Sequence, residues 1–285
     1  MKPQNRSRIV LTIISKTLMA AAVCLACQSV QATLLFNDGF NYATGNLGSS
    51  DTSPAGFSGN AWSGGSSHIT VTSGNLTYSG LQDLGGNQLQ DTWGISAGSV
   101  LNTYTAQTSG NIYYSFLLNC STAPSATTYL TSLNPGTGAP NGSSDALQVD
   151  VAANAGGFQV GLRTAGASIS LAPTVLSLNT TYMVVAEYSF GTTGSATLYL
   201  NPVVGNVQPT ADVTLAGNGS VTTIDDLGFK AQNTPTTGTF SLDDVRVGTT
   251  WDDVTPVSVV PEPSAIALAG LGVCGLTWHF RRRRS

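Results

Sequence analysis

The chain has 285 residues and a formal net charge of −4, and only 9% of its residues are charged. Eight of the eleven cations lie near the two ends, so residues 33–260 hold three basic and fourteen acidic side chains, a net charge of −11. A segment this acidic offers no basic surface to a phosphate backbone, which argues against a nucleic-acid partner. The 41% of hydrophobic residues is enough for a core and argues against disorder.

The first 32 residues have the three parts of a secretory signal peptide. Basic residues precede an apolar run, TLMAAAVCLAC, and the small residues Val30 and Ala32 predict cleavage after Ala32. Cys24 and Cys27 lie inside this peptide, which disfavours a redox or metal role for the pair. Lipoprotein processing at Cys27 is the alternative, although Cys24 stands where an apolar residue is expected.

Short apolar or alternating runs recur between residues 33 and 256, bounded by Gly, Asn, Asp or Pro. This spacing is typical of a single all-β sandwich of antiparallel strands. Gly-rich connections at 153–157 and 191–194 predict hairpins, and we expect rim loops at 121–144 and 202–220. The predicted strands are 34–36, 68–72, 111–119, 146–152, 157–164, 181–190, 195–201, 224–231 and 240–248.

The chain ends in VVPEPSAIALAGLGVCGLTWHFRRRRS, residues 259–285. A Pro-Glu-Pro-Ser turn precedes 265–280, an apolar segment that predicts a short transmembrane helix. The arginines after it predict a membrane stop on the cytoplasmic side. The turn comprises Pro261, Glu262, Pro263 and Ser264, and the stop comprises Arg281, Arg282, Arg283 and Arg284.

This order of motif, apolar helix and arginine cluster resembles the PEP-CTERM sorting signal of Gram-negative bacteria that make exopolysaccharide. The resemblance implies recognition by a membrane-embedded exosortase, with the tail 257–285 acting as an address rather than as part of the fold. It implies export to the cell envelope, outer surface or extracellular matrix, with a transient anchor in the inner membrane. Signal peptidase and exosortase are the implied partners during export.

Three phrases within 33–256 resemble a concanavalin A-like jelly roll of the laminin-G type. They are FNDGFNYATGNL, LNTTYMVVAEYSFGTTGSATLYLNP, and IDDLGFKAQ followed by GTFSLDDVRVGTTWDDVTP. The resemblance implies that the first and last strands pair, which would bring 36–40 beside 245–251. It supports the fold and says little about activity.

The acidic residues argue against a glycoside hydrolase, which needs two carboxyl groups facing one cleft. The chain has only two glutamates, and Glu262 belongs to the sorting motif. Glu187 has Ser189 at the next position on its face, so no second acid joins it within the strand. The same strand resembles the metal-binding strand of legume-type lectins, but Ser189 replaces the aspartate. We expect Glu187 to be solvated on the outer face and the protein not to be an enzyme.

Aspartates and tryptophans supply the remaining candidate sites. Calcium takes six to eight oxygen ligands, which loops at a sandwich rim can provide; a solvated acidic rim is the alternative. Exposed tryptophans would offer a surface for sugar stacking; burial in the core is the alternative. His68 is the only histidine between 33 and 256, which leaves too few histidines for a histidine metal centre or a Ser-His-Asp triad. The candidate calcium ligands are Asp38, Asp225, Asp226 and Asp243, and the candidate glycan contacts are Trp62 and Trp93.

The sequence therefore predicts an exported, non-enzymatic bacterial protein with three segments: a signal peptide (1–32), a jelly-roll ectodomain (33–256) and a sorting tail (257–285). We expect it at the cell surface or in the extracellular matrix, associated with exopolysaccharide or biofilm. The alternative is a lectin-like module that binds polysaccharide, with or without calcium. A glycoside hydrolase is the third choice, and calcium is the only cofactor that the sequence suggests.

Overall fold

The computed structural model describes residues 33–48, 61–94, 96–136, 145–165, 167–217, 221–233 and 235–258. The predicted signal peptide, sorting motif, transmembrane helix and arginine stop lie outside these residues. Within them, no helix is both long and apolar enough to cross a membrane.

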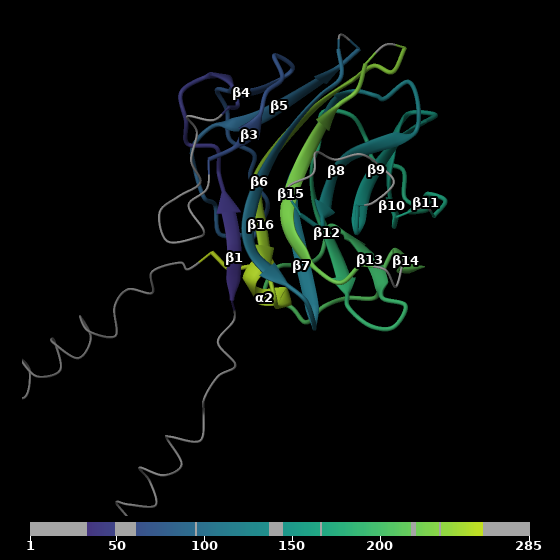
Figure 1. The fold of residues 1–285 in the computed structure, drawn as a ribbon. Coiled ribbons are helices and arrows are strands. Elements are labelled where there is room, and N and C mark those ends of the chain that lie inside the picture. The colour runs from purple at the N-terminus through teal and green to yellow at the C-terminus, as the bar shows by residue number, and fades with distance from the viewer. Residues whose placement is uncertain are drawn as a thin grey trace, which may run out of the picture.

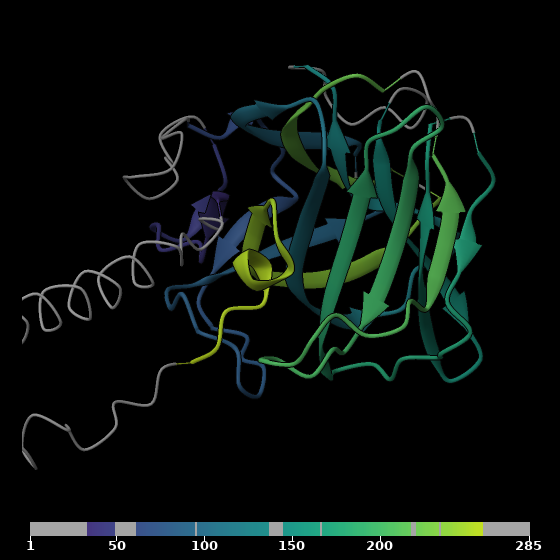
Figure 2. The same cartoon turned by 90° about the horizontal axis from the view of Figure 1, so that it is seen from below.

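The described residues form sixteen strands and one short helix, and the strands make two sheets that pack face to face (Figures 1 and 2). The strands are β1 (Leu34–Asp38), β2 (Gly45–Asn46), β3 (Ser63–Gly64), β4 (Ile69–Thr72), β5 (Gln88–Trp93), β6 (Gly98–Gln107), β7 (Asn111–Thr122), β8 (Thr128–Asn134), β9 (Leu147–Asn154), β10 (Gly157–Arg163), β11 (Ser170–Leu171), β12 (Thr181–Ser189), β13 (Ser195–Leu200), β14 (Val213–Ala216), β15 (Ile224–Ala231) and β16 (Gly238–Gly248), and the helix is α2 (Trp251–Val254).

The nine-stranded sheet has the order β14-β13-β12-β7-β16-β5-β4-β2, with β1 paired to β16. The seven-stranded sheet has the order β11-β10-β9-β8-β15-β6-β3. Neighbouring strands are antiparallel, so the predicted all-β jelly-roll class is confirmed. The first and last strands pair as expected, with Phe36 opposite Val247 and Asp38 opposite Val245. Both predicted hairpins form, between β9 and β10 and between β12 and β13.

Each of the nine predicted strands has a counterpart, but two predicted loops are wrong. The segment 121–144 contains β8, and 202–220 contains β14. Strand β8 carries Ser132 and Asn134 on its outer face, so its TYLTSLN sequence has the composition of a loop. Strands β5 and β6 were not predicted; in β5 the buried position between Leu89 and Trp93 is an aspartate, which interrupts the apolar alternation.

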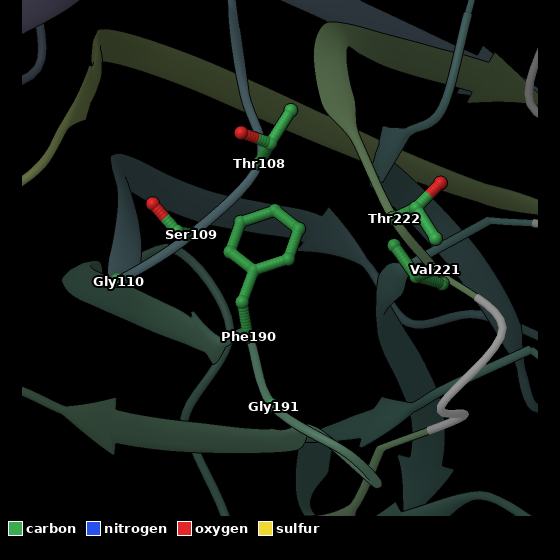
Figure 3. A pocket seen from close by; sticks show the side chains of 7 residues that line it. All are labelled: Thr108, Ser109, Gly110, Phe190, Gly191, Val221 and Thr222. Carbon is green, nitrogen blue, oxygen red and sulfur yellow. The ribbon is translucent and has the colours of Figure 1, made fainter.

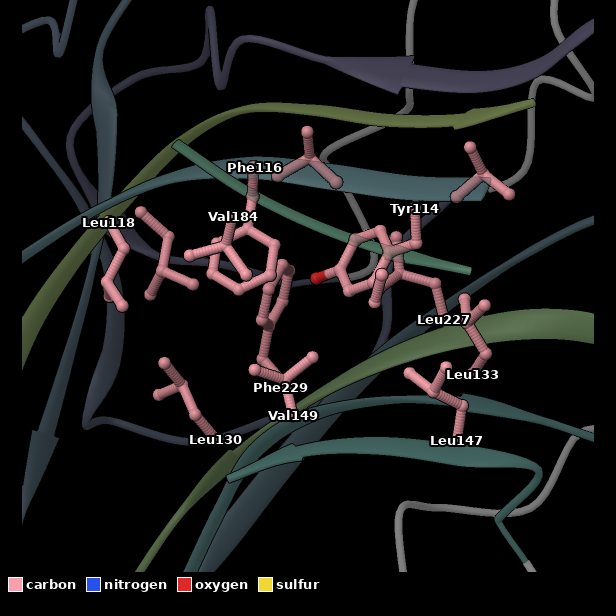
Figure 4. Packing of buried hydrophobic residues seen from close by; sticks show 14 of the residues in the cluster. Tyr114, Phe116, Leu118, Leu130, Leu133, Leu147, Val149, Val184, Leu227 and Phe229 are labelled. Atoms are coloured by element: carbon pink, nitrogen blue, oxygen red, sulfur yellow. The ribbon is translucent and has the colours of Figure 1, made fainter. Parts of the chain in front are cut away.

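The main core lies between the two sheets, where Figure 4 shows aromatic and aliphatic side chains from both. Phe116 of β7 and Val184 of β12 come from one sheet, and Val149 of β9 and Phe229 of β15 come from the other. Each such side chain contributes about 1.5–3 kcal/mol when fully buried. The hydroxyl of Tyr114 reaches Thr131 Oγ1 at 2.7 Å, so this polar atom is satisfied inside the core.

A smaller apolar cluster covers the outer face of the nine-stranded sheet. Trp251 of α2 packs edge-on against Tyr113 and Tyr199, and Val204 joins the same cluster. Tyr78 donates a hydrogen bond to the Pro202 carbonyl at 3.2 Å. Residues after β13 therefore pack over this face instead of forming a rim loop, while the outer face of the seven-stranded sheet carries polar side chains.

Candidate functional site

Four neighbouring strands of the seven-stranded sheet, β15, β8, β9 and β10, bring polar side chains together on the outer face. Gln148 and Asp150 of β9 alternate with Leu147, Val149 and Val151, which point into the core. Strand pairing then aligns Asp226 with Asn134, Ser132 with Gln148, Gln148 with Arg163, and Tyr129 with Asp150. We call this set the polar face: Tyr129, Ser132, Asn134, Gln148, Asp150, Arg163 and Asp226.

Most of these side chains are fully buried, yet much of their hydrogen-bonding capacity is unused. Asp150, Gln148 and Asp226 are 0% exposed, whereas Tyr129 and Arg163 are half-buried. Buried polar atoms are nearly always hydrogen-bonded, so a group of unpartnered ones calls for an explanation. The buried atoms without a hydrogen-bond partner on this face are Ser132 Oγ, Asn134 Oδ1, Gln148 Oε1, Asp150 Oδ2, Arg163 Nε and Asp226 Oδ2.

The partners that do exist hold these side chains in place. Asn134 Nδ2 donates to Asp226 Oδ1 at 2.6 Å, and Gln148 Nε2 donates to Asp145 Oδ2 at 2.8 Å. Arg163 Nη2 pairs with Asp150 Oδ1 at 3.1 Å, and its guanidinium carbon lies 5.7 Å from the centre of the Tyr129 ring. Apart from Ser132 Oγ, the unpartnered oxygens are therefore attached to side chains whose other polar atom is already bonded.

Burial changes the ionisation of two carboxyl groups on this face. It raises the pKa of Asp226 to about 7; the Asn134 hydrogen bond opposes the shift, and the charges of Asp225 and Asp145 add to it. Burial also raises the pKa of Asp150 to about 6, and the charge of Arg163 opposes this. Asp226 is thus partly protonated near neutral pH, so it can donate as well as accept a hydrogen bond.

Five of the six unpartnered atoms are oxygens that accept hydrogen bonds. An unmet buried acceptor costs about 1–3 kcal/mol, so a ligand rich in hydroxyl donors would be stabilised here once these atoms, which have almost no exposed surface, are opened to it. The half-buried ring of Tyr129 adds an amphipathic aromatic surface at the edge. This arrangement suits a polyhydroxylated ligand.

The structure does not bring the predicted calcium ligands together. Asp225 and Asp226 lie in the seven-stranded sheet, whereas Asp38 and Asp243 lie in the other. The Asp38 carboxylate accepts hydrogen bonds from Phe40 N, Tyr42 OH and Trp62 Nε1 at 2.6–2.9 Å. Among the described residues, no group of three or more Asp, Glu, His or Cys side chains is placed to hold a metal ion.

The predicted glycan contacts are wrong, because both indoles are buried in the main core. Trp62 is 0% exposed and Trp93 is 3% exposed. Trp62 packs against Phe36 and Phe229, and its N–H donates to Asp38 Oδ2 at 2.9 Å. A buried indole has no free face for a sugar ring.

The expectation for Glu187 is also wrong: the side chain is on the outer face but is only 6% exposed. Its carboxylate accepts hydrogen bonds from Asn111 Nδ2 at 2.8 Å, Tyr199 OH at 3.0 Å and Gln208 Nε2 at 2.8 Å. Gln208 belongs to the segment that packs over this sheet, so Glu187 is a structural anchor for that segment.

Cys120 is a free, buried cysteine near the end of β7. Its thiol donates to the Thr122 carbonyl at 3.2 Å, and burial raises its pKa to about 12. Because the thiolate is the reactive form, this thiol is inert at neutral pH.

A pocket of about 350 Å³ opens at the end of the sandwich that carries the β6–β7 turn (Figure 3). It lies between that turn, the segment after β12 and the segment before β15. The lining comprises Thr108, Ser109, Gly110, Phe190, Gly191, Val221 and Thr222.

The polar face was not predicted, because its residues come from four strands and the sequence analysis considered acidic pairs within a single strand. The signal that was present is the alternation in LQVDVA, where Gln148 and Asp150 interrupt an otherwise apolar strand at every second position. Ser132 and Asn134 lie in the segment 121–144, which the sequence predicts as a loop, so their strand alternation is not evident from the sequence. Pairing of four strands, which single-sequence patterns do not reveal, brings the residues of the polar face together.

Comparison with known proteins agrees with the predicted tail and fold. Residues 259–284 match the PEP-CTERM protein-sorting motif, which implies an exported protein sorted by exosortase to the cell envelope. A comparison with curated protein sequences found no match.

Solved structures with a similar arrangement of strands include carbohydrate-active enzymes. The endo-β-1,4-glucuronan lyase of the fungus Trichoderma reesei aligns with a TM-score of 0.50 and 12% identity, over 80% of this chain and 100% of the lyase chain. A mutant of alginate lyase Aly36B in complex with alginate trisaccharide aligns with a TM-score of 0.49 and 13% identity, over 76% of this chain and 97% of the other. At such low identity the first likeness shows the fold alone.

Proposed function

We propose that this chain, which carries the PEP-CTERM sorting motif, is a non-enzymatic protein of the outer cell surface or extracellular matrix of a Gram-negative bacterium. Its sandwich binds polysaccharide through the polar face, with exopolysaccharide or a biofilm matrix as the natural setting. Signal peptidase and exosortase are its partners during export, and the tail anchors it in the inner membrane until it is processed.

The observation that supports this function is the group of buried, unpartnered oxygens on the polar face. A polysaccharide first meets the half-buried Tyr129 and Arg163, and binding opens the face so that sugar hydroxyl groups supply the missing donors without bringing a charge into the site. The charges also fit a mainly uncharged ligand, because Arg163 is already paired with Asp150. The glucuronan lyase of similar fold acts on a polysaccharide, and we extend polysaccharide binding, but not cleavage, to this chain.

The spacing of the carboxyl groups supports binding rather than hydrolysis. Strand β8 lies between the strands of the two carboxyl groups: Asp226 of β15 pairs with Asn134, and Asp150 of β9 pairs with Tyr129. The two aspartates are therefore two strands apart across the sheet and five residues apart along it. At about 4.8 Å between strands and about 3.3 Å per residue, their backbones lie far beyond the roughly 5–9.5 Å between the carboxyl groups of a glycosidase pair. The charge of Asp145 raises the pKa of Asp226, so Asp145 and Asp226 are the pair to test for activity.

Replacing Gln148 with leucine should weaken polysaccharide binding about tenfold, because one unpartnered acceptor is lost while side-chain size is kept. The measurement is calorimetric titration of the full-length protein in detergent with neutral and acidic polysaccharides, including that of the host, with and without calcium. Thr214→Ala, an exposed change in the other sheet, is the matched control and should bind normally.

Two results would contradict the proposed function. Failure of the wild-type protein to bind any polysaccharide, including that of the host, would remove the binding role. Release of reducing ends by the wild-type protein, abolished in Asp226→Asn, would show that the protein is an enzyme.

Replacing Pro261, Glu262 and Pro263 together with alanine should leave an unprocessed, membrane-retained form, because the motif is the recognition signal. Immunoblotting of membrane and extracellular fractions measures this. Alanine replacement of Pro256, which lies before the motif, is the control and should not affect processing. Unchanged appearance of mature protein outside the cell would show that the motif does not direct sorting.

A further inference from the structure

The pocket around Phe190 is held by contacts among the segments that form it. The backbone N–H of Phe190 donates to the Gly110 carbonyl at 2.9 Å, which fixes the end of β12 against the β6–β7 turn. The Phe190 ring packs edge-on against Tyr188, with ring centres 5.3 Å apart. The ring is half-buried, and Figure 3 shows it standing in the pocket opposite Val221 and Thr222.

The chemistry of the lining points to an uncharged ligand. None of the seven lining residues carries a charge, so the pocket has no group to pair with a phosphate, carboxylate or ammonium. Thr108, Ser109 and Thr222 place hydroxyl groups around the aromatic ring, and each hydroxyl can donate or accept a hydrogen bond (Figure 3). A volume of about 350 Å³ lies within the usual range for small-molecule sites. An aromatic ring surrounded by hydroxyl groups suits the C–H face and hydroxyls of a neutral sugar ring.

The pocket adjoins the polar face through strand β15. Thr222 precedes Asp226 by four residues, which an extended chain spans in at most about 14 Å. Gln107, next to Thr108 of the lining, pairs with Ile224 in the same part of the sheet. A ligand bound on the polar face would have to extend past the start of β15 to reach this pocket.

We propose that this pocket is a second carbohydrate subsite, which holds one neutral sugar ring against Phe190 at the end of a polysaccharide bound on the polar face. The proposal rests on the proposed function. The polar face supplies hydrogen bonds along the chain, and the pocket adds an aromatic contact that only a longer ligand reaches. Affinity should therefore rise with chain length until both parts are filled.

The test compares variants by titrating the full-length protein with oligosaccharides of increasing length, prepared from whichever neutral polysaccharide the wild-type protein binds. Phe190→Ala should lower the affinity for long chains at least tenfold and leave the affinity for the shortest binding oligosaccharide unchanged. Phe190→Trp should preserve the affinity for long chains, because it keeps an aromatic face. Thr222→Val removes an exposed hydroxyl at nearly constant side-chain size, so this variant should fold normally. Its affinity for long oligosaccharides should be about threefold lower than that of the wild type. Thr214→Val, the same change on β14, is the control and should have no effect.

The outcomes separate the two proposals. If Gln148→Leu weakens binding while Phe190→Ala and Thr222→Val bind long chains as the wild type does, the pocket is not a subsite and the proposed function stands. If the wild type binds only anionic polysaccharides and Phe190→Ala lowers the affinity for them, the assignment to a neutral sugar is wrong. If the wild type binds no polysaccharide, both proposals fail.

Discussion

Replacing Asp91 with leucine should raise the free energy of unfolding at pH 7 by about 3–4 kcal/mol. Asp91 lies in β5 between Leu89 and Trp93, faces the core and is 0% exposed. Neither carboxyl oxygen has a hydrogen-bond partner. Burial raises the pKa of Asp91 to about 8, and the nearby Trp93 side chain offsets only part of this shift. An apolar side chain of similar size would avoid the cost of burying this carboxyl group.

The effect should depend on pH in a definite direction. An unfolded aspartate loses its proton near pH 4, whereas Asp91 keeps its proton in the folded protein up to about pH 8. Between these values the folded state binds one more proton, so wild-type stability falls by up to about 1.4 kcal/mol for each pH unit as pH rises. The contribution of Asp91 to the pH dependence should vanish below about pH 4 and become constant above about pH 8.

Urea unfolding of the wild type and Asp91→Leu from pH 4 to pH 9 measures this difference. The two stabilities should converge towards pH 4 and separate steadily up to pH 8. Asp252→Asn, a change at an exposed carboxyl group, is the matched control and should leave the wild-type profile intact. A constant difference at all pH values would mean that Asp91 titrates normally and that its cost is one of packing.

The fold could be predicted from sequence wherever apolar alternation and turn residues agree. Strands β12 and β13, with their glycine-containing connection, illustrate this: an apolar run, GTTG and a second alternating run predicted the hairpin correctly. Prediction failed where a strand breaks the pattern for a local reason. Asp91 puts a carboxyl group at a core position of β5, so the strand lacked the continuous apolar face that the reasoning required.

The candidate site was less predictable than the fold because it depends on pairing between distant strands. Asn134 and Asp226 are far apart in sequence, and their hydrogen bond exists only because β8 and β15 are neighbours. Of the aspartates selected from the sequence, Asp226 lies on the polar face, whereas Asp38 and Asp243 accept hydrogen bonds within their own surroundings in the other sheet. The register of the strands, which composition does not reveal, determines which side chains meet.

The pair Asp243 and Asp244 shows the same dependence on backbone detail. A regular strand would point these side chains to opposite faces, but β16 contains a bulge between Asp243 and Arg246, and Asp244 has a positive φ of 50°. Asp243 Oδ2 accepts a hydrogen bond from Leu76 N and Asp244 Oδ1 accepts one from Leu84 N, each at 2.8 Å. The bulge thus lets both carboxyl groups hold the segment before β5.

Replacing Arg246 with leucine should destabilise the protein by about 3–5 kcal/mol, the usual cost of leaving a buried charge without its partner. Arg246 is 1% exposed, and its Nη1 lies 3.8 Å from Asp244 Oδ2. The guanidinium also donates to the carbonyls of Asp244 and Gln82, so it ties the bulge to the segment before β5. Its charge lowers the pKa of Asp244 against the effect of burial, which leaves that value at about 6.

Urea unfolding at pH 7 measures this cost, with Lys230→Leu, a half-exposed cation in the other sheet, as the matched control. The control should change stability by less than about 1 kcal/mol. Adding Asp244→Asn to Arg246→Leu should recover a substantial part of the loss, because the double variant no longer buries an unpaired carboxylate. If the double variant is no more stable than Arg246→Leu alone, the bonds from Arg246 to the Gln82 and Asp244 carbonyls, rather than its charge, hold the bulge against the segment before β5.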